Sequence, residues 1–289
     1  MSIIERKNKI ILGTAQFGMN YGINNLKGKI PQNEINNILE YSYINGIRSL
    51  DTAEAYGTSI NEIGEFHRLN PSHKFKIYSK LNPNQINDNF LRNLSSGLKK
   101  LSVDSYEGYM IHDFIKFKKT PELALNLFEA KKMGLIKKVG ISLYSNEDIK
   151  DVINKFDFDF IQLPFNLLDN SFQRKNIIKD SNIEIHIRSI FLQGLFFMPS
   201  SLIPEKLKPL CKHITMLEEF AYKNNSTVEE IAIKYPFSKN YIDKIIFGVD
   251  NLIQLKRNIK IIDKPNSISY KKIDSIRVLE KELLNPSNW

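Results

Sequence analysis

Eight short apolar runs alternate with stretches of helical periodicity along this chain of 289 residues, and this alternation constrains the fold more than any other feature. The runs cover residues 10–12, 47–50, 75–80, 106–111, 138–141, 158–163, 183–187 and 242–247. Alternating strands and helices favour parallel pairing with right-handed crossovers, and the closed form of that topology is a barrel. We therefore predict an α/β protein with a (β/α)8 TIM barrel, formed as a single domain by residues 1–289, and an extra C-terminal helix over residues 268–284.

An open, doubly wound sheet is the main alternative to the barrel. Such sheets commonly bind dinucleotides through a Gly-x-Gly-x-x-Gly run after a strand, and no such run follows any of the eight strands here. The candidate catalytic residues described below all stand at or just past strand ends, which is where the active sites of barrels lie. The sequence therefore favours the barrel.

Several helix boundaries can also be predicted. Thr120 is expected as an N-cap with Pro121 at the first helical position, and Gly134 should end that helix. Ser145 should cap the next helix, because Asp148 stands three residues further on. A further capped helix is expected over residues 226–235.

Composition limits the functional classes. No apolar run approaches the roughly 20 residues of a membrane span, and the N-terminus lacks the layout of a signal peptide, so we expect a cytoplasmic protein that does not bind membranes. The lone Cys211 excludes an internal disulfide and agrees with a reducing compartment. The net charge of +9 suits anionic cofactors or substrates, but the basic clusters are too short for a nucleic-acid-binding tail. The sequence does not indicate an oligomeric state.

The most informative motif is the segment 51–57, which reads Asp-Thr-Ala-Glu-Ala-Tyr-Gly and follows the second apolar run. It places the carboxylate of Asp51 and the phenol of Tyr56 at a strand end. A phenol has a pKa of about 10, so it donates a proton readily near neutral pH only if a nearby positive charge stabilises its anion. Lys80 ends the third run and His112 follows the fourth.

This order of carboxylate, phenol, amine and imidazole resembles the aldo-keto reductase family, and the resemblance covers almost the whole chain. In that family an Asp-Tyr-Lys-His tetrad at the top of a (β/α)8 barrel reduces a carbonyl with a nicotinamide cofactor. The resemblance implies that Tyr56 is the general acid and that Lys80 lowers its pKa. It also implies that Asp51 keeps Lys80 charged and that His112 donates a hydrogen bond to the carbonyl oxygen.

The resemblance also implies where the cofactor binds. Ser142 and Gln162 match residues that hold the nicotinamide carboxamide in the family, whereas Leu143 replaces the family's Asn. Ser189 matches a serine after the seventh strand. The full set of expected cofactor contacts is Gly13, Thr14, Ala15, Asp51, Ser142, Gln162, Arg188, Ser189, Gln193, Gly194, Gly248, Val249, Gln254, Arg257 and Asn258.

Arg188 stands where many members of the family stack an aromatic ring on the nicotinamide. A guanidinium can also stack, and it can bind phosphate or carboxylate. Arg188 could therefore serve the cofactor, the substrate or a structural ion pair. If it serves the substrate, that small-molecule carbonyl compound should be anionic; a sugar-derived compound is also considered.

The choice of cofactor depends on the loop after the eighth strand. Gly248, Val249 and Gln254 stand where relatives that prefer NADPH carry residues that bind its 2′-phosphate. The N-terminus of the following helix, together with Lys256 or Arg257, could compensate, whereas Asp250 would repel the phosphate. We expect both cofactors to be accepted, with NADPH ahead of NADH by a modest margin.

Three other functional expectations follow. A barrel could instead act as a binding or regulatory subunit that holds the cofactor with little turnover, although the intact tetrad speaks against it. A barrel lyase that uses Lys80 as a Schiff-base amine is a weaker alternative. We expect no catalytic metal, because the remaining histidines show no metal-ligand spacing with one another or with Cys211.

Overall fold

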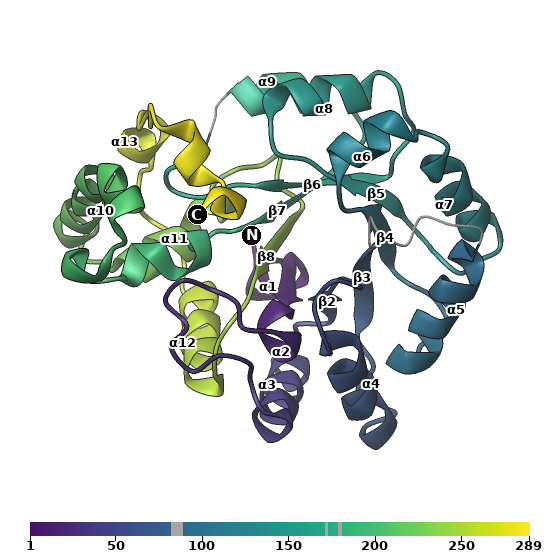
Figure 1. The fold of residues 1–289 in the computed structure, drawn as a ribbon. Coiled ribbons are helices and arrows are strands. Elements are labelled where there is room, and N and C mark those ends of the chain that lie inside the picture. The colour runs from purple at the N-terminus through teal and green to yellow at the C-terminus, as the bar shows by residue number, and fades with distance from the viewer. Residues whose placement is uncertain (82–88, 171–172, 179–180) are drawn as a thin grey trace.

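A computed structural model describes residues 1–81, 89–170, 173–178 and 181–289 of the chain. Its eight strands form a closed parallel barrel, in which they follow one another in chain order and β8 pairs with β1 (Figure 1). The strands are β1 (Ile10–Gly13), β2 (Ser49–Asp51), β3 (Lys76–Leu81), β4 (Gly108–Ile111), β5 (Val139–Ser142), β6 (Phe160–Pro164), β7 (Glu184–Arg188) and β8 (Lys244–Phe247). The predicted TIM barrel is therefore confirmed.

Helices form a ring around the strands (Figure 1). Those that follow strands or their loops are α2 (Ala15–Gly18), α3 (Gln32–Ile44), α4 (Ser59–Leu69), α5 (Phe90–Leu101), α6 (Phe114–Lys119), α7 (Leu123–Lys132), α8 (Asn146–Ile153), α9 (Gln173–Ile178), α10 (Cys211–Lys223), α11 (Val228–Phe237) and α12 (Leu252–Asp263). The N-terminal α1 (Ile3–Asn8) precedes the barrel. Short 3₁₀ helices, Leu192–Phe197, Ser200–Leu202 and Glu205–Leu210, connect β7 to α10.

Alternation of side chains along each strand divides the core in two. Residues such as Leu12 and Leu50 point outward and join the large cluster under the helices. The inner cluster, which fills the barrel, consists of Ile11, Tyr78, Met110, Phe160 and Ile246. The barrel is thus packed through its centre, and a ligand must bind at its carboxyl end, where the strands stop.

The helix predicted to begin at Pro121 begins at Leu123, and a separate short helix precedes it. Asp113 accepts a hydrogen bond from the Lys116 N–H and so caps the separate short helix α6. Thr120 ends α6 and is not an N-cap, and α7 begins at Leu123 after a turn. Gly134 lies beyond the end of α7 with a φ of +77°, which suits a residue without a β-carbon.

The other two capping predictions are closer to the structure. Ser145 and Asp148 form the expected capping box at the start of α8. The helix expected over residues 226–235 is α11, in which Thr227 is the N-cap and the last residue is Phe237.

The C-terminal segment is helical only in pieces, so the continuous helix expected over residues 268–284 is wrong. It contains α13 (Lys271–Asp274) and the 3₁₀ helices Lys281–Leu284 and Pro286–Asn288. Ile276 and Val278, two residues apart, are both buried, a spacing that a straight helix cannot place on one face. The segment packs beside α10 and α11 through Tyr270, whose ring lies 5.2 Å from that of Tyr235 (Figure 1).

Candidate active site

The four tetrad residues meet at the carboxyl end of the barrel because they come from consecutive strands. Asp51 is the last residue of β2, Lys80 is the penultimate residue of β3, and His112 directly follows β4. Tyr56 lies in the loop between β2 and α4. Parallel pairing places these strand ends side by side.

Lys80 and Asp51 form a buried ion pair. Their side chains are 1% and 5% exposed, and the Lys80 ammonium donates to the Asp51 carboxylate and, at 3.0 Å, to the carbonyl oxygen of Thr52. Gln162 donates from Nε2 to the other carboxylate oxygen of Asp51 at 2.7 Å. Burial lowers the pKa of Lys80, while the charge of Asp51 opposes that shift.

The phenol of Tyr56 is packed against this pair. The Lys80 ammonium lies 4.9 Å from the centroid of the Tyr56 ring, and the His112 ring meets the Tyr56 ring edge-on with a centroid distance of 6.4 Å. Burial, followed by the charge of Asp51, raises the pKa of Tyr56, so the net shift in the protein alone is opposite to the lowering expected from Lys80. The negative charge of Asp51 offsets part of the positive charge of Lys80 at the phenol.

His112 is held in its neutral form. Burial and the positive charges of Lys80 and Arg188 lower its pKa to about 4. A neutral imidazole has one N–H donor and one acceptor nitrogen. His112 can therefore donate a hydrogen bond near pH 7 without first taking up a proton.

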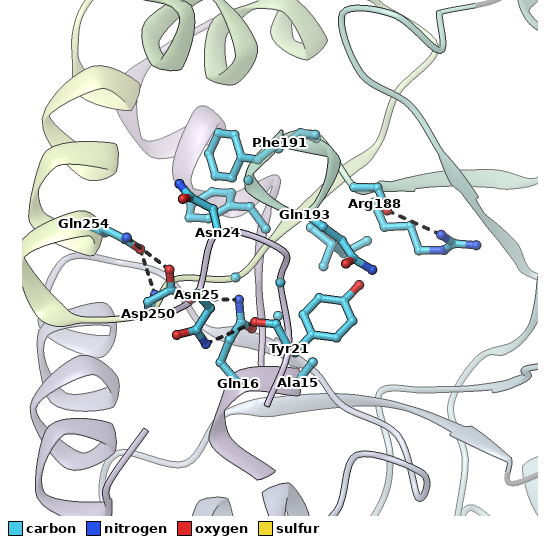
Figure 2. A pocket seen from close by; sticks show the side chains of 18 of the residues that line it. Ala15, Gln16, Tyr21, Asn24, Asn25, Arg188, Phe191, Gln193, Asp250 and Gln254 are labelled. Carbon is cyan, nitrogen blue, oxygen red and sulfur yellow. Dashed lines mark hydrogen bonds between the residues drawn. The ribbon is translucent and has the colours of Figure 1, made fainter. Parts of the chain in front are cut away.

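A cavity of about 390 Å³ is lined by Tyr56 and by residues of α12 such as Gln254. Figure 2 shows part of this lining, with Arg188 on one side and Gln254 on the other. Most of the expected cofactor contacts line this cavity. These are Gly13, Thr14, Ala15, Asp51, Arg188, Ser189, Gln193, Gly194, Gly248, Gln254, Arg257 and Asn258.

Three expected contacts are not among the residues that line this cavity. Val249 is 2% exposed and belongs to the core. Gln162 is directed to Asp51, and Ser142 pairs with Gln162 in the register of β5 and β6.

The structure adds a wall that the sequence did not reveal. Tyr21, Asn24 and Asn25, from the loop after α2, line the cavity together with Gln16 and Phe191 (Figure 2). The Ile23 N–H donates to the Gln193 carbonyl at 3.1 Å, which joins this loop to the one after β7. Residues 20–28 are rich in Asn and Gly, which predicts a loop but not the surface against which it folds.

The end of the cavity near α12 is acidic as well as basic. Asp250 is held by Gln254, whose Nε2 lies 3.2 Å from its carboxylate, and by a 3.5 Å contact with the Gln16 amide. Arg257 is already paired with Glu229 at 3.3 Å. The Leu252 N–H at the start of α12 donates to the Glu34 carboxylate at 2.8 Å, so one donor expected to attract a phosphate is taken.

A second cavity, of about 490 Å³, lies between the loop after β5 and the C-terminal segment. Tyr144, Pro164, Arg277 and Lys281 are among its lining residues. The guanidinium of Arg188, which lines the first cavity, lies over the ring of Tyr144, which lines the second. The two cavities therefore approach each other at this pair.

The chain thus forms a closed parallel barrel that carries a buried lysine–aspartate pair, a phenol and an imidazole at the carboxyl ends of its strands. This is the end of the barrel at which barrel enzymes place their active sites. The model of the Aldo/keto reductase family matches residues 9–279, and the chain belongs to this family. Membership implies an oxidoreductase that uses a nicotinamide cofactor on a small-molecule carbonyl compound.

Individual relatives are distant. Rhazimal reductase 2 from Alstonia scholaris is 22% identical over 265 residues, which are 83% of this chain and 78% of that protein. The aldo-keto reductase AKR11C1 from Bacillus halodurans, in its holo form, superposes with a TM-score of 0.72 at 17% identity and covers 95% of this chain and 91% of its own. The glycerol dehydrogenase AKR11B4 from Gluconobacter oxydans gives 0.71 at 20% identity, with coverages of 96% and 93%. These structural matches show the fold alone.

Two features are absent from the residues that the structure describes. No group of three or more His, Cys, Asp or Glu side chains is arranged to hold a metal ion in that part of the chain. Within the same residues, no helix has the length and apolar character needed to cross a bilayer.

Proposed function

We propose that this protein reduces an aldehyde or ketone to an alcohol with NADPH or NADH, and that Tyr56 supplies the proton. One observation carries the proposal: Tyr56 lines the 390 Å³ cavity at the carboxyl end of the barrel and packs against both the Lys80–Asp51 pair and His112. We also propose that residues 1–289 act as one domain in the cytoplasm.

The residues present fit a nicotinamide cofactor. Gln162 uses its Nε2 on Asp51, but its Oε1 is buried and has no hydrogen-bond partner in the described part of the chain. A buried acceptor without a partner is costly, and the amide group of a nicotinamide could satisfy it. Gln162, Ser142 and Asp51 would hold the nicotinamide end, and Gly248, Gln254 and Asn258 the adenosine end. When bound, the reduced cofactor supplies a hydride to the carbonyl carbon.

The tetrad supplies the proton and stabilises the charge that builds on the carbonyl oxygen. Because the pKa of Tyr56 is raised, its phenol keeps its proton at neutral pH and is ready to donate it from Oη to that oxygen. Lys80 lies close enough to stabilise the phenolate as it forms, while Asp51 keeps the ammonium charged and in place. The N–H of neutral His112 donates to the same oxygen and helps to orient it.

The expected preference for NADPH by a modest margin stays part of this proposal, since it rests on the family. The Asp250 carboxylate and the Arg257–Glu229 pair both weaken a 2′-phosphate site. The margin should therefore be small, and both reduced cofactors belong in any assay.

A turnover screen tests the proposed activity. Both reduced cofactors are incubated with sugar, keto-acid and aromatic aldehydes, and consumption of the cofactor is followed. Binding of cofactor without turnover of any carbonyl would instead support the regulatory-subunit alternative. The Schiff-base alternative is disfavoured because the Lys80 side chain is 1% exposed and its ammonium makes two hydrogen bonds; borohydride trapping on Lys80 would support that alternative.

Tyr56→Phe is the sharpest variant for this proposal. It removes one hydroxyl, so the fold and cofactor affinity should persist while kcat falls at least about a hundredfold. Cofactor titration and circular dichroism provide the controls. Near-normal turnover in the folded variant would remove Tyr56 from its proposed role.

A further inference from the structure

Arg188, the last residue of β7, is a half-buried cation without an anionic partner in the described part of the chain. Its Nη2 is buried and makes no hydrogen bond to a described residue. Its Nη1 reaches only the hydroxyl of Ser189, at 3.4 Å. No salt bridge joins Arg188 to any carboxylate of the described residues, which argues against the structural ion pair that the sequence left open.

The contacts that Arg188 does make leave most of its N–H donors without a hydrogen-bond partner among the described residues. Its guanidinium carbon lies 4.5 Å from the centroid of the Tyr144 ring, so one flat face is covered. The donors of a guanidinium lie in its plane, and stacking does not satisfy them. Removing such a charge from water without pairing it costs free energy, and a bound oxyanion would offset that cost.

Arg188 lies at the reacting end of the cavity. It lines the same cavity as Tyr56 and Tyr21, and its positive charge opposes the rise in the pKa of both phenols. It also contributes to the lowered pKa of His112. Figure 2 shows Asp250 and Gln254 on the opposite side of the cavity, with the guanidinium of Arg188 pointing away from them.

Two sources could bring an oxyanion to this place: the phosphates of the cofactor or the substrate. The residues expected to bind the adenosine end, Gln254 and Arg257, lie across the cavity in α12, and the reduced nicotinamide ring is uncharged. The nearby carboxylate of Asp51 is occupied by Lys80 and Gln162. The cofactor's diphosphate, which joins its two ends, is tested below by cofactor affinity, and the other source is a group carried by the carbonyl compound itself.

We propose that Arg188 binds an oxyanion, a carboxylate or a phosphate, on the carbonyl substrate and so selects anionic substrates over neutral ones. This inference rests on the proposed reductase function and names the class of its substrate. The planar guanidinium can hold either oxyanion through two parallel hydrogen bonds.

Matched substrate pairs provide the kinetic test. Succinic semialdehyde is compared with its methyl ester, and glyceraldehyde 3-phosphate with glyceraldehyde, so each pair differs in charge at one group. For at least one pair, kcat/KM of the wild type should favour the anion by about tenfold or more, and Arg188→Met should abolish that preference by lowering kcat/KM for the anion about tenfold more than for its neutral partner. Arg188→Lys should restore part of it. Arg92→Met, on the exposed face of α5, is the control for net charge and should leave the preference unchanged.

A binding test separates this inference from the proposed function. Succinate and inorganic phosphate, which have no reducible group, are titrated by calorimetry into protein saturated with oxidised cofactor. At least one should bind the wild type about tenfold more tightly than Arg188→Met, and neutral succinamide should not. If no carbonyl is reduced but this difference is found, the reductase proposal fails and the oxyanion site stands.

Three results would overturn the inference. If Arg188→Met lowers kcat/KM equally for the charged and the neutral members of both pairs, Arg188 does not distinguish substrates by charge. Weaker cofactor binding in Arg188→Met by the same factor as the loss in kcat/KM would assign Arg188 to the cofactor's phosphates. Equal affinity of wild type and variant for both test anions would show that no oxyanion binds there.

Discussion

Lys80 and Asp51 show how one buried pair at the residue scale supports both stability and chemistry. Both side chains are almost fully buried, and each neutralises the other. Removing one partner leaves an uncompensated buried charge, whereas removing both leaves none. The same pair also determines how much positive field reaches Tyr56.

A double-mutant cycle should reveal this coupling. Lys80→Met alone should lower the free energy of unfolding by about 3 kcal/mol or more. The Asp51→Asn, Lys80→Met double variant should lose clearly less than the sum of the two single changes, with a coupling of at least about 1 kcal/mol. Urea unfolding of the four proteins measures it. Additive losses would mean that the pair is not coupled in the folded protein.

The sequence predicted these residues but not their protonation behaviour. Asp51, Lys80 and His112 could be placed because a strand end fixes where the backbone emerges, and parallel strands end on one side. The raised pKa of Tyr56 depends on burial by residues distant in the chain, and no local pattern carries that information.

At the scale of elements, Gly18 fixes the loop that presents Tyr56. It ends α2, and a β-carbon on it would overlap the carbonyl oxygen of Tyr56 and crowd the Ser59 N–H. The Thr58 N–H also donates to the Gly18 carbonyl at 3.3 Å. Any side chain at this position would push the loop of Tyr56 away from α2.

Gly18→Ala should therefore lower the free energy of unfolding more than the replacement of a glycine that has no neighbouring atoms near its β-carbon position. Gly134→Ala is the matched control, because nothing lies within 4 Å of its β-carbon and only its φ of +77° opposes the change. We expect Gly134→Ala to cost about 1 kcal/mol of stability, and Gly18→Ala at least about twice as much, together with most of the turnover. Equal losses in thermal unfolding for the two variants would contradict the proposed contact.

The loop between β8 and α12 should control cofactor choice. Asp250 faces the cavity and is held by Gln254 and Gln16, so its charge is fixed near the expected ribose. Asp250→Ser should tighten binding of NADPH relative to NADH by about threefold or more, because it removes a repulsive charge from the 2′-phosphate. Fluorescence titration with both cofactors measures the ratio. An unchanged ratio would place the 2′ position away from Asp250.

Element-scale prediction from sequence succeeded where a local rule operates and failed where packing decides. Ser145 and Asp148 form their capping box through contacts within one turn, so the pattern sufficed. Residues 268–284 carry apolar residues at mixed spacing, and packing against α10 and α11 selects short helical pieces instead of one helix. The loop that contains Tyr21 and Asn24 packs against the loop after β7. This contact joins segments far apart in the sequence, so no local pattern predicts it.

For the whole molecule, the alternation of eight strands with helices was sufficient to predict the closed barrel. Each strand–helix unit must bury one face of its helix, and repetition leaves few alternative topologies. The inner packing could not be predicted. Gly108 and Gly140 leave room for the ring of Phe160, which lies 4.5 Å from the ring of His186, an arrangement that depends on the closed shape.

Buried histidines should make the whole fold sensitive to acid. Burial lowers the pKa of His67, His112, His186 and His213 in the folded protein. His67 shows the structural reason most clearly. Its Nε2 accepts the Phe75 N–H at 3.1 Å, and its Nδ1 lies 2.8 Å from the Leu101 carbonyl, so only the neutral ring with hydrogen on Nδ1 satisfies both.

The direction of the pH dependence follows from these lowered values. The unfolded chain takes up protons on its histidines near pH 6.5, whereas the folded chain does so only at lower pH, so falling pH favours unfolding. The stability that the neutral histidines contribute is fully present above about pH 7. Because its folded pKa is about 4, His112 alone should account for a loss of about 1–2 kcal/mol between pH 7 and pH 5. We expect the free energy of unfolding, measured with urea, to fall in total by more than about 2 kcal/mol over that range.

Two histidine variants test the structural reason. Between pH 7 and pH 5, His67→Gln should lose less free energy of unfolding than His73→Gln, which is the control at a partly exposed residue beside Glu40. Equal stability of the wild type at pH 7 and pH 5 would refute the role of the buried histidines.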